Sequence, residues 1–129
     1  MRVITGSARG RKLKAPQGMD VRPTTDSVKE AIFNIIQFDV EGRRVLDLFA
    51  GTGQMGIEAL SRGARECVFV DSSRQSLNIV KENLKLCSLQ GTVISGDAVS
   101  YLSRGEKFDL VFMDPPYDSD LYAQALPSF

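Results

Sequence analysis

The sequence contains no histidine, and it has only two cysteines and five prolines among its 129 residues. Histidine is the commonest general base and the commonest metal ligand. Its absence excludes a serine–histidine hydrolase or a histidine-ligated zinc site built from this chain alone, and we expect no metal site. No apolar run approaches the roughly 20 residues that a membrane span requires, and the N-terminus lacks the apolar core of a signal peptide. A cytoplasmic protein without membrane contact is therefore expected.

The composition is that of a soluble globular protein, with 43% apolar and 25% charged residues, and the length fits one domain. The two cysteines, Cys67 and Cys87, fall within segments of periodic apolar residues. We interpret both as buried free thiols in a reducing compartment, rather than as a disulfide or a nucleophile.

The charged residues are unevenly distributed, although 16 basic and 16 acidic residues give a formal net charge of zero. Residues 1–22 carry a net charge of +5, and residues 23–129 carry −5. We therefore predict a basic N-terminal arm over residues 1–22 and a separate domain over residues 23–129. The arm is either a solvated tail or a surface that contacts nucleic-acid phosphates without sequence specificity. Its basic residues are Arg2, Arg9, Arg11, Lys12, Lys14 and Arg22.

The first part of the chain predicts a hairpin and one helix. Short strands are predicted over residues 2–5 and 12–14, on either side of a Ser-Ala-Arg-Gly turn. Thr24 or Thr25 can cap a helix that ends before Gly42. Its apolar residues follow the i, i+3, i+4, i+7, i+8 spacing of a helix with one buried face. They are Val28, Ala31, Ile32, Ile35 and Ile36.

From residue 44 onward, strand and helix patterns alternate. Strands are predicted over residues 45–49, 67–70, 92–94 and 108–113. A helix is predicted over residues 53–62, with Gly63 as its C-terminal cap. A second helix begins after Ser72 or Ser73, which caps it, and its apolar side carries Leu77, Val80, Leu84 and Cys87. A third, short helix is predicted over residues 98–102. This order predicts an α/β fold in which a parallel sheet carries helices on both faces through right-handed crossovers.

Residues 51–56 read GTGQMG, a G-x-G-x-x-G motif that follows a predicted strand and opens a helix. Asp71 follows Gly51 by 20 residues, at the end of the next strand. Glycines allow a ligand to approach the backbone closely, and a carboxylate at this place can accept bonds from two ribose hydroxyls. We interpret the motif as a nucleoside-binding loop rather than as a tight turn that merely requires glycine.

An acid precedes these glycines, because the approach reads DLFAGTG from Asp47. A dinucleotide-binding strand usually runs into the glycines without an acid, and a carboxylate there repels a pyrophosphate. The acid suits a ligand with a cationic amine, such as the methionine part of S-adenosylmethionine. Asp97 follows the third strand, where its side chain either accepts a bond from an adenine amino group or caps the next helix.

The sequence Asp114-Pro115-Pro116-Tyr117 directly follows the last predicted strand. Two prolines fix φ twice, so the loop is stiff. Such a loop can present the Asp114 carboxylate and the Pro115 carbonyl as paired acceptors for an exocyclic NH2 group, which turns the nitrogen lone pair toward an electrophile. Tyr117 offers a face on which a flipped-out base can stack, worth roughly 1–3 kcal/mol. The alternative is an ordinary proline-rich turn.

Together these motifs resemble a Rossmann-like class I S-adenosylmethionine-dependent methyltransferase of the exocyclic-amine type. Over essentially the whole chain, the sequence is similar to the bacterial small-subunit (16S) ribosomal RNA guanine-N2-methyltransferase family. The glycine loop and DPPY are shared widely, whereas the N-terminal segments are specific to this family. The segments that carry the resemblance are RVITG from Arg2, RGRKL from Arg9, RPT from Arg22, KEAIFN from Lys29, DLFAGTGQMGIEALSRGA from Asp47, Asp71, Asp97 and DPPY.

The resemblance implies that S-adenosylmethionine is the cofactor. Asp47 would lie near its methionine end, Asp71 would hold its ribose, and Asp97 with Ala98 would hold its adenine. The implied cofactor-binding residues are Asp47, Phe49, Gly51, Thr52, Gly53, Asp71, Ser72, Asp97 and Ala98.

The resemblance also implies that 16S rRNA or an assembly intermediate of the small ribosomal subunit is the partner. The basic residues of the arm would grip rRNA phosphates. The implied catalytic residues, which would hold the target guanine, are Asp114, Pro115, Pro116 and Tyr117.

Members of that family continue beyond DPPY with three more strands and their helices. We therefore expect the last strands of the fold to be missing and a strand edge to be uncovered, which favours self-association. Methyl transfer to guanine N2 is the first hypothesis. DNA adenine-N6 methylation with the same loop is one alternative, and a non-catalytic fragment that binds cofactor or RNA is another. A nicotinamide-dependent dehydrogenase has the least support, because nothing in the chain resembles a hydride-transfer acid.

Overall fold

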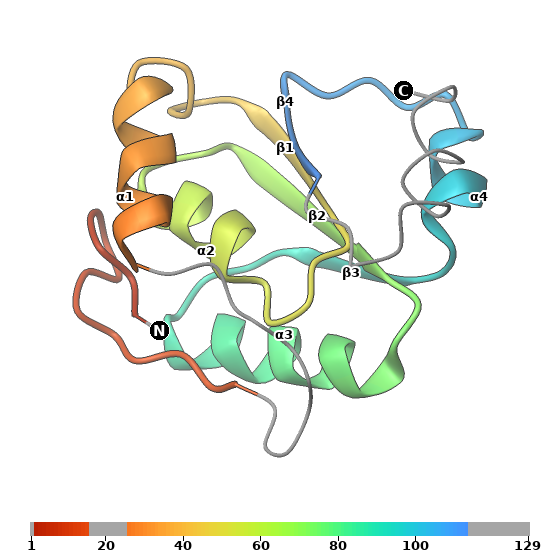
Figure 1. Ribbon diagram of the computed structural model, residues 1–129, viewed down its shortest axis with the longest axis horizontal. Coiled ribbons are helices and arrows are strands. Elements are labelled where there is room, and N and C mark those ends of the chain that lie inside the picture. The colour runs from red at the N-terminus through yellow and green to blue at the C-terminus, as the bar shows by residue number, and fades with distance from the viewer. Residues whose placement is uncertain (1, 16–25, 114–129) are drawn as a thin grey trace.

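The computed structural model describes residues 2–15 and 26–113, and these contain four helices and four strands (Figure 1). The helices are α1 (Asp26–Ile35), α2 (Gln54–Ser61), α3 (Arg74–Leu86) and α4 (Ala98–Leu102). The strands are β1 (Arg44–Leu48), β2 (Glu66–Asp71), β3 (Thr92–Ser95) and β4 (Leu110–Met113). The predicted alternation of strands and helices from residue 44 onward is confirmed, with boundaries that differ by at most about two residues.

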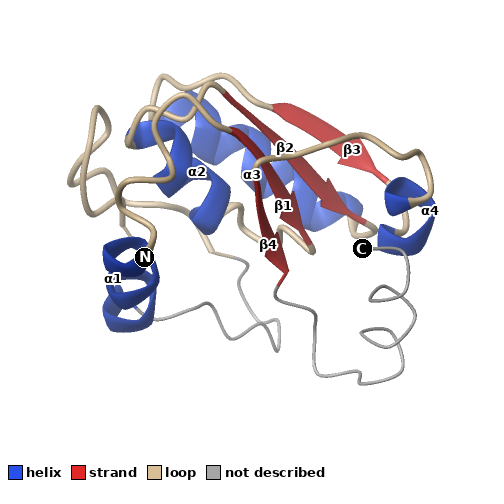
Figure 2. Cartoon of the chain, turned by 90° about the horizontal axis from the view of Figure 1, so that it is seen from above, coloured by secondary structure: helices blue, strands red, loops and turns tan. Residues whose placement is uncertain are grey.

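The four strands form one parallel sheet in the order β3-β2-β1-β4 (Figure 2). From β1 the chain proceeds outward to β2 and β3, and it then returns to place β4 on the other side of β1. The strand order therefore reverses between β1 and β4. In open α/β sheets, ligands bind outside the carboxyl ends of the strands at such a switch point.

Side chains of β1 alternate between the two faces of the sheet. Val45 joins a core with residues of α1, α2 and α3, whereas Leu46 joins a smaller core with residues of α4. The first core includes Phe33, Ile57 and Val80, and the second includes Leu48, Ala98 and Tyr101. Helices therefore cover both faces of the sheet, as predicted, and Figure 2 shows α4 on the side opposite α2 and α3.

Helix α2 ends at the predicted glycine. Gly63 adopts a φ of 101°, and its N–H donates to the Leu60 carbonyl at 3.1 Å. The Ala64 N–H donates to the Ala59 carbonyl at 3.0 Å. These two bonds form a Schellman motif, which satisfies carbonyls that the end of a helix otherwise leaves without partners.

The predicted buried face of α1 is wrong. Val28 is 50% exposed and Ile35 is 82% exposed, whereas Lys29 and Phe33 are fully buried. Ala31 is also exposed, and Ile32 and Ile36 are half-buried. The ring of Phe33 packs against Phe112 of β4, with 5.4 Å between ring centroids, and Lys29 forms a buried ion pair with Glu58 of α2. These two contacts turn the helix away from the orientation that the aliphatic spacing predicts. The predicted caps, Thr24 and Thr25, lie outside the described residues.

Residues 2–15, called the N-terminal hairpin below, fold back with a single antiparallel bridge between Arg2 and Lys12 rather than with two strands. The Val3 N–H donates to the Arg11 carbonyl at 2.9 Å, and the Gly10 N–H donates to the Val3 carbonyl at 2.9 Å. Three apolar residues of the hairpin are buried in the larger core, and they are Val3, Ala8 and Leu13. The basic N-terminal segment is thus packed onto the sheet-and-helix body through its apolar residues.

Candidate functional site

The glycine loop turns at the carboxyl end of β1, between this strand and α2. Gly51 and Gly53 have φ values of 59° and 80°, in the left-handed region that favours glycine. The Gly51 N–H donates to Oδ2 of Asp71 at 2.9 Å, and the Gly53 N–H donates to the Ala50 carbonyl at 2.8 Å. The loop is therefore tied both to itself and to the end of β2.

The three glycines of the motif meet different surroundings. A Cβ atom at Gly51 would have no described atom within 4 Å, so within residues 2–15 and 26–113 this side of the loop has space for a ligand. At Gly53 a Cβ would approach the side chain of Val80 to 3.1 Å. At Gly56 it would lie 2.4 Å from the ring of Phe69, so this glycine allows α2 to pack closely on β2. One glycine thus provides ligand space, and the last provides helix–sheet packing.

The two acids of the site brace the backbone around this loop. Asp47 is only 4% exposed, and its Oδ2 accepts a bond from the Gly56 N–H at 3.0 Å. Asp71 accepts from Gly51 through Oδ2 and from the Ser73 N–H through Oδ1 at 2.8 Å. A carboxylate oxygen has two lone pairs, so each Asp71 oxygen retains acceptor capacity for a ligand hydroxyl. Asp71, which the sequence predicts to bind a ribose, thus lies in direct contact with the glycine loop, and the binding itself stays a prediction.

Phe49 adopts a φ of 61°, which is uncommon for a residue other than glycine. The strand therefore ends at Leu48, one residue earlier than predicted. Strained backbone of this kind is found at ligand sites, where the surrounding contacts hold it in place. Phe49 is half-buried against the smaller core on the α4 face of the sheet, beside the start of the glycine loop.

Asp97 is the N-cap of α4, since its Oδ2 accepts bonds from the Ser100 N–H at 3.0 Å and from the Ser100 hydroxyl at 3.1 Å. It is exposed, whereas Ala98 is buried and Ser72 is exposed. The Gly96 N–H donates to the backbone carbonyl of Asp71 at 3.1 Å. This bond draws the segment after β3 against the end of β2, so the ends of β1, β2 and β3 form one continuous edge.

The predicted catalytic residues Asp114, Pro115, Pro116 and Tyr117 lie outside the described residues, as does Arg22. The strand that leads to them is described. Met113, the last residue of β4, lies opposite Leu48, the last residue of β1. The chain therefore leaves β4 at the edge where the glycine loop begins, on the other side of the switch point.

Five of the six predicted RNA-contacting residues lie in the N-terminal hairpin, and all five are exposed: Arg2, Arg9, Arg11, Lys12 and Lys14. Arg2 pairs with Asp26 at 3.5 Å, and Lys14 pairs with Glu82 at 3.3 Å. Within the described part of the chain, Arg9, Arg11 and Lys12 form no ion pair. Their charge is available to an anionic partner such as a phosphate.

Sequence reasoning missed a buried polar network beneath the hairpin. Glu58 of α2 accepts bonds from the N–H groups of Ile4 and Thr5, at 2.8 and 3.0 Å, and pairs with Lys29 at 3.6 Å and with Arg62 at 2.9 Å. Burial lowers the pKa of Lys29, and the charge of Glu58 opposes this shift. Helical spacing offers one signal, because Glu58 and Arg62 stand four residues apart, but nothing in the pattern identifies Lys29 as buried.

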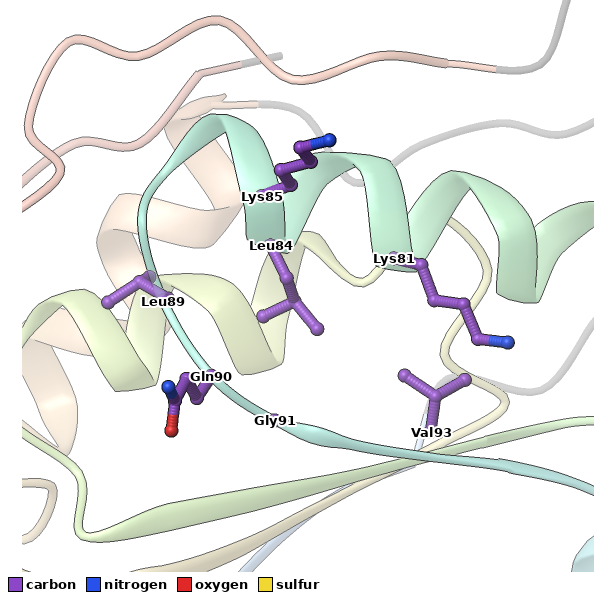
Figure 3. A pocket seen from close by; sticks show the side chains of 7 residues that line it. All are labelled: Lys81, Leu84, Lys85, Leu89, Gln90, Gly91 and Val93. Atoms are coloured by element: carbon purple, nitrogen blue, oxygen red, sulfur yellow. The ribbon is translucent and has the colours of Figure 1, made fainter.

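A groove of about 500 Å³ between α3 and β3 contains no predicted site residue (Figure 3). It is lined by Lys81, Leu84, Lys85, Leu89, Gln90, Gly91 and Val93. Gln90 and Gly91 precede β3, so the groove lies toward the amino ends of the strands, away from the glycine loop. Among the described residues, no group of three or more acids or cysteines is placed to hold a metal ion, and no helix is long and apolar enough to cross a membrane.

The parallel sheet, the glycine loop at its switch point and the acid at the end of β2 define a Rossmann-like fold, and similar solved structures identify it as the fold of class I methyltransferases. A solved structure, the putative methyltransferase yhhF from Escherichia coli, matches with a TM-score of 0.89 at 35% identity, covering 99% of this chain and 71% of that one. The chain belongs to the family described as conserved hypothetical protein 95, whose model matches residues 1–128. The family resemblance found in the sequence is thereby confirmed.

Two curated relatives are similar over most of this chain. The putative rRNA methyltransferase YlbH of Bacillus subtilis is 50% identical over 123 residues, which cover 91% of this chain and 67% of that protein. The ribosomal RNA small subunit methyltransferase D of Haemophilus influenzae is 39% identical over 132 residues, covering 98% and 68%. The chain thus spans about two thirds of the length of these relatives.

Proposed function

We propose that the protein transfers a methyl group from S-adenosylmethionine to the exocyclic N2 of a guanine in small-subunit (16S) ribosomal RNA, in the cytoplasm. The names of the relatives support rRNA methylation. The choice of an exocyclic amine rests on the DPPY sequence after β4. Free 16S rRNA or an assembly intermediate of the small subunit is the proposed partner.

The observation that carries the proposal is the open side of the glycine loop at Gly51, at the switch point of the sheet. S-adenosylmethionine, when bound, supplies an electrophilic methyl group. We assign its ribose to the carboxylate of Asp71, which retains acceptor capacity at each oxygen. Asp97 and Ala98 lie farther along the same edge, where they would hold the adenine. Asp47 is assigned to the methionine end by its negative charge beneath the loop, with Phe49, Thr52, Gly53 and Ser72 completing the site.

The target base is assigned to the other side of the switch point. Asp114 and the carbonyl of Pro115 would accept the hydrogens of the guanine NH2 group, and Pro116 would keep this pair of acceptors rigid. Tyr117 would stack on the flipped base. The amine needs no strong base, because it can release its proton after it has received the methyl group. The exposed cations of the N-terminal hairpin would hold the flanking phosphates.

To test the proposed cofactor site, a side chain is introduced on the open side of the glycine loop. Asparagine tolerates a positive φ better than other residues with a side chain, so Gly51→Asn keeps the turn and places a side chain where the cofactor would lie. We expect at least a tenfold loss of S-adenosylmethionine affinity by calorimetry. We expect a matching loss of methyl transfer to unmethylated small-subunit rRNA, followed as N2-methylguanosine after digestion.

Gly42→Asn is the matched control. Gly42 has a φ of 76°, a Cβ there would meet no described atom within 4 Å, and it lies before β1, at the opposite end of that strand from Gly51. We expect this variant to retain cofactor binding and methyl transfer. Equal losses in both variants would contradict the proposed site. Methylation of DNA adenine instead of rRNA would overturn the proposed substrate, and cofactor binding with no turnover on either would identify a non-catalytic binding protein.

A further inference from the structure

Asn83 of α3 is fully buried and connects the glycine loop to the N-terminal hairpin. Its Nδ2 donates to the Thr52 carbonyl at 3.1 Å and to the Lys14 carbonyl at 3.1 Å. Its Oδ1 accepts from the Lys14 N–H at 2.7 Å. One side chain therefore contacts both the middle of the predicted cofactor loop, at Thr52, and the last part of the N-terminal hairpin, at Lys14.

The amide of Asn83 has its two donors and one acceptor lone pair in use, so its orientation is fixed. Two of these bonds go to the backbone of Lys14, where they act as a strand partner would. The third bond fixes the peptide between Thr52 and Gly53 from its carbonyl side. The N–H side of that peptide is fixed by the Ala50 carbonyl at 2.8 Å. The loop peptide is therefore held from both sides, and Asn83 provides the bond on its carbonyl side.

The other half of the hairpin is attached to the helix that the glycine loop opens. Ser61 of α2 accepts the Ser7 N–H through its carbonyl at 2.8 Å and the Ala8 N–H through Oγ at 2.9 Å. Glu58 holds Ile4 and Thr5. These bonds reach α2 but not the loop itself. Asn83 makes direct contact with both Thr52 and Lys14.

We propose that Asn83 is a positioning residue that couples the two halves of the site, so that cofactor in the glycine loop raises the affinity of the hairpin for RNA. This inference rests on the proposed function. A movement of Thr52 or of Lys14 away from Asn83 leaves buried polar atoms without partners, so the two segments hold their positions together. A ligand that fixes one segment reduces the ordering that the other ligand must impose, and the effect is reciprocal.

The experiment measures coupling rather than affinity alone. S-adenosylhomocysteine is the probe for the cofactor, because it cannot transfer a methyl group during the measurement. Its dissociation constant is determined by calorimetry with and without saturating unmethylated small-subunit rRNA. In the unmodified protein we expect rRNA to tighten binding by about 5-fold or more, within the usual range of coupled sites. The dissociation constant for rRNA should fall by the same factor when S-adenosylhomocysteine is present.

The coupling factor is the dissociation constant of S-adenosylhomocysteine without rRNA divided by that with rRNA. Asn83→Ala removes all three bonds, and we expect it to reduce this factor to within twofold of one. If Asn83 had a purely structural role, its loss would weaken the binding of both ligands and leave the coupling factor unchanged. Glu82→Gln is the matched control, because Glu82 neighbours Asn83 on α3 and pairs with Lys14 at 3.3 Å through an exposed contact. It should preserve the coupling factor. Asn83→Asp keeps the acceptor for the Lys14 N–H but loses both Nδ2 donors, to the carbonyls of Thr52 and Lys14, so it should also abolish coupling.

The outcomes separate this inference from the proposed function. If the unmodified protein binds cofactor and rRNA without coupling, the role of Asn83 is refuted and the proposed function stands. If it binds neither ligand, the proposed function itself fails. An unchanged coupling factor in a folded Asn83→Ala or Asn83→Asp protein overturns the inference. Loss of folding in both variants, judged by circular dichroism, would assign Asn83 to the scaffold alone and would overturn it as well.

Discussion

Removing the carboxylate of Glu58 takes away the ion-pair partner of buried Lys29, whose Nζ keeps its bond to the Arg2 carbonyl at 2.6 Å. It also takes away the acceptors of the Ile4 and Thr5 N–H groups. Loss of one member of a buried ion pair costs about 3–5 kcal/mol, because the remaining charge stays desolvated. We therefore expect Glu58→Ala to lower the free energy of unfolding by about that amount. Urea denaturation followed by circular dichroism measures the change.

Two further variants make this single-residue prediction specific. Glu82→Gln removes the exposed partner of Lys14, and exposed pairs contribute about 0–1 kcal/mol, so its effect should be small. The double variant Lys29→Met with Glu58→Leu replaces the buried pair by apolar side chains of similar size, and it should recover part of the stability lost in Glu58→Ala. A loss in Glu58→Ala no larger than that in Glu82→Gln would show that the buried pair contributes nothing.

At the scale of elements, helix α1 allows a direct comparison between two apolar residues on different faces. Phe33 is fully buried against Phe112, and Ile35 is 82% exposed. Truncation of a buried phenylalanine costs about 3–5 kcal/mol. We expect that loss for Phe33→Ala and a change within about 0.5 kcal/mol for Ile35→Ala. Urea midpoints of the two variants measure the difference. Equal losses of stability would show that the aliphatic face of α1, rather than the face with Phe33, is buried.

The strands and α3 could be predicted from the sequence because each carries a single dominant pattern. Leu77, Val80 and Leu84 repeat at helical spacing, and the structure buries all three. The face of α1 could not be predicted, because two apolar faces compete there. The aliphatic face is largely exposed, and the buried face instead carries the aromatic ring of Phe33 and the side chain of Lys29. A lysine counts as exposed in any hydropathy pattern. Its burial here depends on two distant groups, the carboxylate of Glu58 and the carbonyl of Arg2, which accepts from Nζ at 2.6 Å.

At the scale of the whole molecule, the candidate site was predictable where a short motif encodes a backbone turn. Gly51, Gly53 and Asp71 follow the spacing of a loop between a strand and a helix, and the structure brings them together. The connection from this loop to the hairpin was not predictable. Asn83 lies 31 residues from Thr52 and 69 from Lys14, and a single asparagine within a helix carries no pattern that identifies its partners.

The stability of the whole molecule should fall in alkaline solution, where the buried thiols govern its pH dependence. Burial, with the nearby negative charge of Asp47 adding to it, raises the pKa of Cys67 well above its ordinary value of 9.0. Burial also raises the pKa of Cys87, and burial with the Glu106 hydrogen bond raises the pKa of Tyr101 to about 12. Above pH 9 the unfolded chain loses thiol protons that the folded protein keeps, so unfolding becomes more favourable as pH rises. Lys29 acts in the opposite direction below pH 10.5, because its lowered pKa lets the folded protein release a proton that the unfolded chain retains.

The contribution of one thiol to the pH dependence of stability can be isolated by comparing two buried residues that are paired on neighbouring strands, Val45 of β1 and Cys67 of β2. Cys67→Ala removes the titrating group, and Val45→Ala removes a similar volume at the paired position without removing a thiol. Urea unfolding is measured at pH 8 and pH 10 in the presence of a reductant, so that thiol oxidation does not contribute. A single thiol held neutral in the folded state accounts for roughly 1 kcal/mol of stability lost over this interval. The loss between the two pH values should therefore be smaller by about that amount in Cys67→Ala than in the unmodified protein. Val45→Ala should lower stability at both pH values and retain the full pH dependence, and an equally steep dependence in Cys67→Ala would show that this thiol does not contribute to it.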